Sequence, residues 1–261
     1  MTRECAVGID LHGTLLDETW QIPDRLADEL DTALRSVQPL CELFLCTGND
    51  LTFVQDRIGH ELASLFDGFV LETGCVVSHG SDEEVLVPPG PLSSMKALEL
   101  RLREDPLPGI EYFGRRLATI SLFTKTERGG ADPTHLFPLV TITVEELGFR
   151  ETVLVTHSDV AVDIIPAGFN KFTGLRRATK APFLIGIADS LNDLHLIANA
   201  NWALLPANAS PSLLAELGSM GRRVEPLSAF QPGSEGTIGM SESRHTEAVI
   251  EILSFLCQHL H

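Results

Sequence analysis

The 261-residue chain lacks any apolar run of the roughly 18 to 20 residues that an α-helix needs to cross a bilayer. Its first segment, MTRECAVGID, also lacks a long apolar stretch that ends at a small-residue cleavage site. We therefore expect neither a membrane-spanning helix nor a secretory signal. The sequence predicts a cytoplasmic protein that does not bind membranes.

Cysteine is sparse and shows no paired pattern. The five cysteines are odd in number, widely spaced and never arranged as Cys-x-x-Cys. A disulfide framework and a structural zinc site are therefore not expected. Cys5 and Cys46 lie inside apolar runs, where the ordinary role of cysteine is that of a small buried thiol.

Positive charge is also scarce. The chain has 19 Lys and Arg against 36 Asp and Glu, which gives a formal net charge of −17. This balance argues against nucleic acid and anionic membranes as partners. An enzyme with this composition that acted on phosphate esters would have to concentrate positive charge locally, through a metal, a lysine or arginines. The composition leaves the oligomeric state open.

Short apolar runs alternate with amphipathic stretches along most of the chain. The runs CAVGI, LFLC and FLIGIA precede Asp10, Thr47 and Asp189. Nearly continuous apolar runs of this length are typical of strands that are buried on both faces of a parallel sheet. Between them, apolar residues recur every three to four positions over residues 22–37 and 51–65, which predicts helices. The alternation predicts an α/β fold with right-handed crossovers.

The periodicity changes in the middle of the chain. A helix predicted over residues 93–103 is combined with the alternating segments LATISLF and TVLVTH, which are typical of strands with one buried face. This mixture predicts an α+β domain, residues 81–165, inserted into a core of residues 1–80 and 166–261. The alternation of strands and helices then resumes, and a last helix is predicted around residues 249–256.

Polar clusters follow the predicted strands of the core. They are DLHGTLLD from Asp10, TGND from Thr47 and ADSLND from residue 188, and Lys171 closes a fourth segment, PAGFNK. Ligands bind beyond the carboxyl ends of the strands in open parallel sheets, so we expect these features to form one site. Asp17 and Asp50 are expected to cap the turn and the helix that follow them. No Gly-x-Gly-x-x-Gly opens a helix after the first strand, which disfavours a dinucleotide site.

In this order and spacing, the clusters resemble the motifs of the haloacid-dehalogenase superfamily. Asp10 matches the nucleophile of the first motif, which reads roughly Asp-x-Asp-Gly-Thr. Thr47 matches the second motif and Lys171 the third. Asp189 and Asp193 match the acidic pair of the fourth motif. The resemblance spans nearly the whole chain.

The position of the insertion resembles one branch of that superfamily. It follows the second motif and precedes the lysine, as a type-II cap does, and the tripeptide ETG at residues 72–74 and the GFN before Lys171 resemble the IIB branch. That branch includes the Cof-like, sucrose-phosphate, trehalose-phosphate and mannosyl-phosphoglycerate phosphatases. One departure is Ala188, which stands where the family usually has glycine. The resemblance implies a Rossmann-like core with a C2B-type cap.

The resemblance further implies a Mg²⁺-dependent phosphatase that hydrolyses a small phosphorylated metabolite, such as a sugar phosphate, through an aspartyl-phosphate on Asp10. Magnesium prefers oxygen ligands. Asp10 and Asp189 can supply carboxylates, and the resemblance assigns a third ligand to the backbone carbonyl of His12. Asp193 would support the metal directly or through another group. Lys171 would neutralise the nucleophile and the charge that develops on the phosphoryl group.

The substrate itself needs donors for its phosphoryl oxygens and for its leaving group. Thr47 and the backbone N–H groups after it are candidates for the phosphoryl oxygens. Asn192, between the two acids of the fourth motif, either positions Lys171 or Asp193, or begins a helix. Two arginines of the inserted domain are candidates for binding an anionic or hydroxyl-rich leaving group. These further substrate-binding candidates are Gly48, Asn49, Asn192, Arg115 and Arg116.

His12 stands where the family has its second aspartate, the general acid and base of the phosphatases. Three interpretations remain open. A histidine, whose ordinary pKa is about 6.5, does the same acid–base work. Alternatively, the chemistry is slowed or redirected, as in a phosphotransferase that uses an acceptor other than water. In the third interpretation, the protein binds phosphorylated ligands without catalysis.

Overall fold

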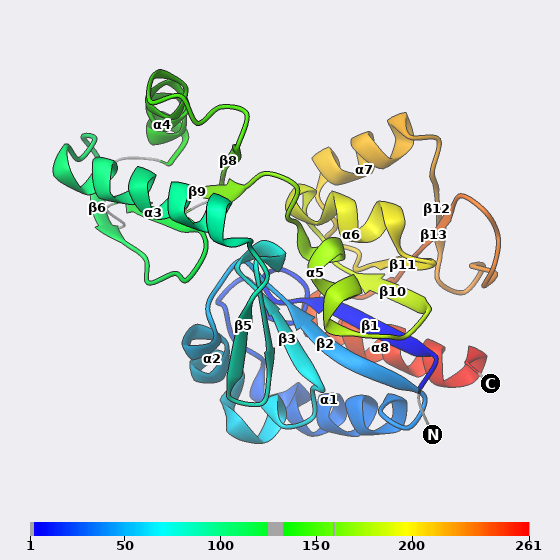
Figure 1. Ribbon diagram of the computed structural model, residues 1–261. Coiled ribbons are helices and arrows are strands. Elements are labelled where there is room, and N and C mark those ends of the chain that lie inside the picture. Colours follow the sequence, from blue (N-terminus) through cyan, green and yellow to red (C-terminus); the bar gives the residue numbers. More distant parts are fainter. Residues whose placement is uncertain (1–2, 125–132, 159, 261) are drawn as a thin grey trace. The chain divides into compact units, whose positions relative to one another are not determined.

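The computed structural model describes residues 3–124, 133–158 and 160–260. The chain forms two compact units (Figure 1). The first, here called the core unit, comprises Met1–Glu83 and Asn170–His261, and the second, the inserted unit, comprises Glu84–Phe169. The inserted unit overlaps the insertion predicted at residues 81–165. In the part of the chain that is described, no helix is long and apolar enough to span a membrane.

The core unit is built on a nine-stranded sheet in the order β12-β13-β11-β10-β1-β2-β3-β4-β5. The strands from β12 to β3 pair in parallel, and β4 is antiparallel to β3. This parallel-dominated sheet confirms the predicted α/β fold. The strands are β1 (Cys5–Asp10), β2 (Cys41–Cys46), β3 (Gly68–Leu71), β4 (Val76–His79), β5 (Asp82–Val85), β10 (Phe183–Ile187), β11 (Trp202–Leu205), β12 (Arg223–Pro226) and β13 (Thr237–Met240).

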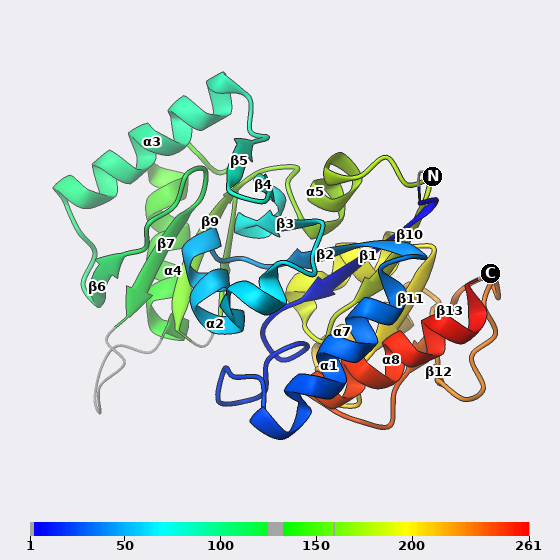
Figure 2. The same cartoon turned by 90° about the horizontal axis from the view of Figure 1, so that it is seen from below.

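Helices cover both faces of the core sheet (Figures 1 and 2). On one face α1 packs against α8, and on the other α5, α6 and α7 follow one another. The apolar residues that predicted the first helix are buried in α1, among them Leu26, Leu30 and Leu34. The bounds are α1 (Asp24–Val37), α2 (Leu51–Ala63), α5 (Lys171–Ala178), α6 (Leu194–Asn199), α7 (Pro211–Ser219) and α8 (His245–His259), with short 3₁₀ turns η1 (Glu72–Gly74) and η2 (Leu191–Asp193).

The inserted unit has its own antiparallel sheet, in the order β6-β7-β9-β8. Its apolar core joins side chains of both helices to the sheet, as Leu98, Val140 and Ile164 illustrate. The helix predicted over residues 93–103 lies within α3, and the two alternating segments overlap β7 and β8, so the predicted α+β character is confirmed. The elements are α3 (Pro89–Glu104), β6 (Ile110–Phe113), β7 (Ile120–Thr124), α4 (Pro133–Glu146), β8 (Val153–His157) and β9 (Ala161–Pro166).

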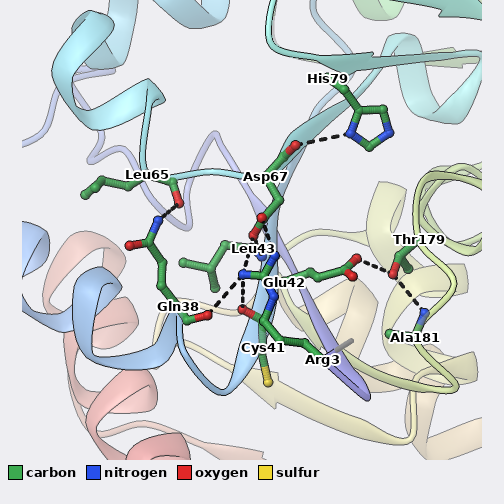
Figure 3. Close-up of polar contacts among 10 residues, drawn as sticks. All are labelled: Arg3, Gln38, Cys41, Glu42, Leu43, Leu65, Asp67, His79, Thr179 and Ala181. Atoms are coloured by element: carbon green, nitrogen blue, oxygen red, sulfur yellow. Dashed lines mark hydrogen bonds and ion pairs between the residues drawn. The ribbon is translucent and has the colours of Figure 1, made fainter. Parts of the chain in front are cut away.

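A polar network fastens the amino ends of the central strands of the core unit (Figure 3). Arg3 forms an ion pair with Asp67 and also donates to the carbonyl oxygen of Cys41 at 3.2 Å. Glu42 accepts a hydrogen bond of 2.5 Å from the hydroxyl of Thr179. These groups satisfy one another at the end of the sheet opposite to the end that carries the predicted catalytic residues.

Cys5 and Cys41 lie directly opposite each other in the register of β1 and β2, and they form a disulfide. Their Cα atoms are 4.6 Å apart. The expectation that Cys5 is a free buried thiol is therefore wrong, because the sequence does not show which residues neighbouring strands bring together. Cys46 is a free buried thiol, as expected, and burial raises its pKa.

Candidate active site

The three polar clusters of the sequence meet at the carboxyl edge of the core sheet. Asp10 ends β1, Thr47 follows β2, and Asp189 lies just after β10. Because β1 lies between β2 and β10, the ends of these three strands are neighbours. The carboxylates of Asp10, Asp189 and Asp193 lie within 4.8 Å of one another. The structure therefore brings together the acidic residues that the sequence predicted for one site.

Lys171 supplies the positive charge between these acids. Its ammonium group lies 2.5 Å from a carboxylate oxygen of Asp10 and 2.5 Å from one of Asp193. Burial alone would lower the pKa of the lysine, but the two carboxylates outweigh this effect and raise it. Lys171 is the first residue of α5, and a capping box between Asn170 and Thr173 fixes the start of that helix.

Two glycines let α5 approach the turn after β3. Gly74 has a φ of +90°, and a Cβ atom there would lie 2.0 Å from the carbonyl oxygen of Asn170. A Cβ atom at Gly174 would lie 2.6 Å from the Cα atom of Gly74. Only glycine permits this backbone contact. The contact sets the position of the helix that begins with Lys171.

The segment that follows β2, residues 47–49, accepts backbone hydrogen bonds from the strained turn η1. Glu72 and Thr73 both have left-handed backbone conformations, with φ of 47° and 56°. In this conformation the N–H of Thr73 donates to the carbonyl of Thr47 at 3.0 Å, and that of Glu72 donates to the carbonyl of Asn49 at 3.1 Å. The side-chain amide of Asn49 lies 3.5 Å from Nδ1 of His12. Strain of this kind persists where surrounding bonds fix it, often beside functional groups.

Hydroxyl groups orient both acids of the fourth motif. Thr14 donates to Asp189 at 3.1 Å, and Ser190 donates to Asp193 at 2.7 Å. Gly13, with a φ of +76°, leaves room for the Asp189 carboxylate, because a Cβ atom there would lie 2.4 Å from it. The roles of Thr14 and Ser190 were not predicted, although both residues lie inside the polar clusters of the sequence.

The acidic cluster carries strong mutual repulsion. Burial and the neighbouring charges of Asp10 and Asp193 raise the pKa of Asp189, and burial and Asp10 raise that of Asp193. A divalent cation would relieve this repulsion, and carboxylate oxygens are the ligands that magnesium prefers. Asp10 and Asp189, together with Asp193, thus fit a site for a divalent cation, and Mg²⁺ as that cation stays a prediction.

His12 has an aromatic environment. Its ring centroid lies 5.1 Å from that of Trp20 and 5.4 Å from that of Phe53. Among the described residues its Nε2 atom is buried without a hydrogen-bond partner. Burial lowers the pKa of His12 to about 4, and the positive charges of Lys171 and Arg57 contribute. The ring is therefore neutral near pH 7.

Asn192, Arg115 and Arg116 are the remaining predicted substrate residues. Asn192 is an exposed residue of η2. Arg115 and Arg116 belong to the inserted unit, where Arg115 is exposed and Arg116 donates to the carbonyl of Arg115 at 2.9 Å. A role in substrate binding stays a prediction for all three.

Two residues far along the chain support the first motif and escaped the sequence analysis. The amide of Asn208 donates to the carbonyl of Gly13 at 2.7 Å, and Nδ1 of His245 lies 3.1 Å from the same oxygen. They lie 195 and 232 residues from Gly13 in sequence. No local pattern marks either residue, so neither could be predicted from the sequence.

The chain has the fold of haloacid-dehalogenase-like hydrolases, an α/β core that carries an inserted α+β unit. This confirms the predicted resemblance at the level of the fold. One similar solved structure is the sucrose-phosphatase of Synechocystis in complex with sucrose and phosphate, with 19% identity, a TM-score of 0.64, and coverage of 97% of this chain and 98% of that chain. A second is a haloacid dehalogenase-like hydrolase of Bacteroides thetaiotaomicron, with 14% identity, a TM-score of 0.63, and coverage of 97% and 99%. No family model and no curated protein matches the sequence.

Proposed function

We propose that the protein is a cytoplasmic, Mg²⁺-dependent phosphatase that hydrolyses a small phosphomonoester, such as a sugar phosphate. The observation that carries this proposal is the position of Lys171, whose ammonium group lies between the carboxylates of Asp10 and Asp193. Asp189 completes the acidic cluster. A buried carboxylate beside a cation and a metal-binding pair of acids is suited to nucleophilic attack on an anionic phosphoryl group.

In the first step, a carboxylate oxygen of Asp10 forms a bond to phosphorus and the bond from phosphorus to the substrate oxygen breaks. Lys171 offsets the negative charge of the nucleophile and of the phosphoryl oxygens. Thr47 and the backbone N–H groups of Gly48 and Asn49 would orient those oxygens. Water then attacks the aspartyl-phosphate, which releases inorganic phosphate and restores the Asp10 carboxylate.

Bound Mg²⁺ would screen the repulsion between the nucleophile and the phosphoryl group. Asp10 and Asp189 would hold it with their carboxylates, Asp193 would support it, and the backbone carbonyl of His12 would be a further ligand. The His12 side chain occupies the position of the proton-transferring aspartate of the similar motif. Whether water or another acceptor takes the phosphoryl group depends on the group that activates the attacking oxygen, so position 12 is the point to test.

The test is phosphate release from a panel of sugar phosphates and p-nitrophenyl phosphate, with and without Mg²⁺. The variants are Asp10→Asn and His12→Asp, and Asp31→Asn serves as a control because Asp31 pairs with Arg35 on an exposed face of α1. We expect Mg²⁺-dependent turnover in the wild type and in the control, and its loss in Asp10→Asn. Turnover that survives in Asp10→Asn would refute the nucleophile.

The same experiment separates the alternatives at His12. A phosphorylated product that appears only when an alcohol is added identifies a phosphotransferase. An inert wild type with an active His12→Asp variant shows that the histidine has silenced or redirected an otherwise intact site. If the wild type, Asp10→Asn and His12→Asp are all inert although they are folded and bind Mg²⁺, hydrolysis of this substrate class is refuted.

A further inference from the structure

Arg57 lies beside the candidate active site and stacks on aromatic rings. Its guanidinium carbon is 5.1 Å from the ring centroid of Phe53 and 5.9 Å from that of Trp20. These are the same two rings that contact His12, which is two positions after Asp10. The guanidinium and the His12 ring are thus linked through two shared aromatic neighbours.

The helix α2 explains the direction of this side chain. Phe53 and Arg57 are four residues apart, so they share one face of the helix. Long helical side chains lean toward the helix N-terminus, and the N-terminus of α2 directly follows the segment of Thr47. Arg57 therefore extends over Phe53 toward the end of the helix where the predicted phosphate-binding residues lie.

A fixed loop brings the second ring into place. Trp20 has a left-handed backbone conformation with a φ of 61°, which is uncommon for a bulky residue. Its N–H donates to the carbonyl of Asp17 at 3.0 Å. The carboxylate of Asp17 accepts from the N–H groups of Thr19 and Gln21, at 2.8 and 3.2 Å. The loop thus maintains a costly conformation that holds the indole against both His12 and Arg57.

Arg57 has no acidic partner among residues 3–124, 133–158 and 160–260, where its recorded contacts are those with the two rings. Some exposed arginines on other helices do pair with acids: Arg35 pairs with Asp31, and Arg103 pairs with Glu99. In a chain with 36 acidic and 19 basic residues, an arginine that avoids carboxylates beside an active site has its N–H groups free for a ligand.

We propose that Arg57 is a specificity-determining residue that binds a second anionic group, on the leaving-group side of the substrate. This inference rests on the proposed phosphatase function. A guanidinium stacked on rings keeps its fork of N–H donors, which matches the oxygen pairs of carboxylate and phosphate. Phe53 and Trp20 hold it there through cation–π contacts. The preferred substrates are therefore phosphomonoesters that carry a further carboxylate or phosphate, rather than neutral sugar phosphates.

Matched substrate pairs test this proposal. The carboxylate pair is 3-phosphoglycerate and glycerol 3-phosphate, and the phosphate pair is fructose 1,6-bisphosphate and fructose 6-phosphate. We expect wild-type kcat/KM to favour the member with the second anion in at least one pair by about 10- to 100-fold, as a charged hydrogen-bonded contact provides. The favoured pair identifies the anion. In Arg57→Gln the preference disappears through a higher KM for that member, and Arg57→Lys restores part of it.

The control is Arg35→Gln, which removes an exposed arginine on α1. This variant should keep the wild-type ratio of kcat/KM between the two members of each pair. If Arg57 only stabilised the loop that holds Trp20, Arg57→Gln would lower the free energy of unfolding and would reduce kcat/KM equally for both members of a pair. That result, or a wild type without preference in either pair, overturns the proposal.

Binding separates a failure of this inference from a failure of the proposed function. If no pair is hydrolysed, the phosphatase proposal fails, and Arg57 is then judged from affinities alone. Titration calorimetry of Asp10→Asn with Mg²⁺ would measure the dissociation constants of both members of each pair. Tighter binding of the member with the second anion by Asp10→Asn supports the role of Arg57 if the double variant, which also carries Arg57→Gln, loses this difference in affinity. Equal affinities overturn it.

Discussion

The ammonium group of Lys171 lies 2.5 Å from a carboxylate oxygen of Asp10, although 161 residues separate the two in sequence. Both side chains are buried, Lys171 with 6% and Asp10 with 4% of its surface exposed. A buried ion pair is held only where the fold fixes both partners, because each charge alone would be costly to bury. The inserted unit lies between them in the chain, so the core unit depends on joining its two segments correctly.

Replacing Lys171 by Met should abolish most of the activity. The change leaves the carboxylates of Asp10 and Asp193 buried without their cation, so we expect phosphate release to fall by roughly 100- to 1,000-fold. Loss of one partner of a buried pair should also lower the free energy of unfolding by about 3–5 kcal/mol. Lys180→Met, at an exposed position, is the control. Turnover near the wild-type rate in folded Lys171→Met would contradict the assignment.

Thr14→Val should weaken Mg²⁺ binding. The hydroxyl of Thr14 donates to Asp189 at 3.1 Å and is fully buried, and loss of such a support typically costs about 10- to 100-fold in metal affinity. Calorimetric titration with Mg²⁺ measures the change directly, and the Mg²⁺ concentration for half-maximal activity should rise in parallel. Thr32→Val, on the exposed face of α1, serves as the control. An unchanged affinity would show that the hydrogen bond does not support the metal site.

Gly74→Ala should be more destabilising than Gly80→Ala. Both glycines have positive φ, +90° and +66°, but a Cβ atom at Gly80 meets nothing within 4 Å. Gly80→Ala therefore measures the conformational cost alone, about 1–2 kcal/mol. Gly74→Ala adds the clash with Asn170 and displaces Lys171, so it should cost more stability and also reduce kcat. Chemical denaturation and steady-state kinetics give both numbers, and equal stabilities would contradict the close contact.

The free energy of unfolding of Asp163→Asn should increase relative to that of the wild type as the pH rises. Burial raises the pKa of Asp163 above its ordinary value of 3.8, and the Ser121 hydrogen bond and the charge of Arg116 offset this effect only in part. The folded state therefore holds this proton more tightly than the unfolded state, so the wild type loses stability as the pH increases from about 4 through the raised pKa. Asparagine does not titrate. The difference in unfolding free energy between variant and wild type should rise over this window and then level off, and a constant difference would refute the raised pKa.

Different features of the sequence predicted the sheet and the acidic cluster. Buried apolar runs marked the parallel strands, and their polar ends marked Asp10, Thr47 and Asp189. Asp50 caps α2 through the N–H of Phe53, as its place before an amphipathic stretch predicted. These features are local, so a linear pattern can show them.

Contacts between distant segments could not be predicted in this way. The disulfide of Cys5 with Cys41 depends on strand register, and the support from Asn208 depends on a loop that folds back over 195 residues. A role for Arg57 could not be predicted, because nothing in its own segment distinguishes it from a solvated helical arginine. Its meaning comes from Trp20, which the fold places against it.

The contact between Gly74 and Gly174 has an evolutionary consequence. One glycine precedes the inserted unit and the other follows it, and their backbones touch within the core unit. The position of Lys171 is thus secured by the core itself, whatever chain runs between the two glycines. Lineages with this architecture can lengthen, trim or exchange that intervening segment, while the arrangement of Asp10 and Lys171 is inherited intact.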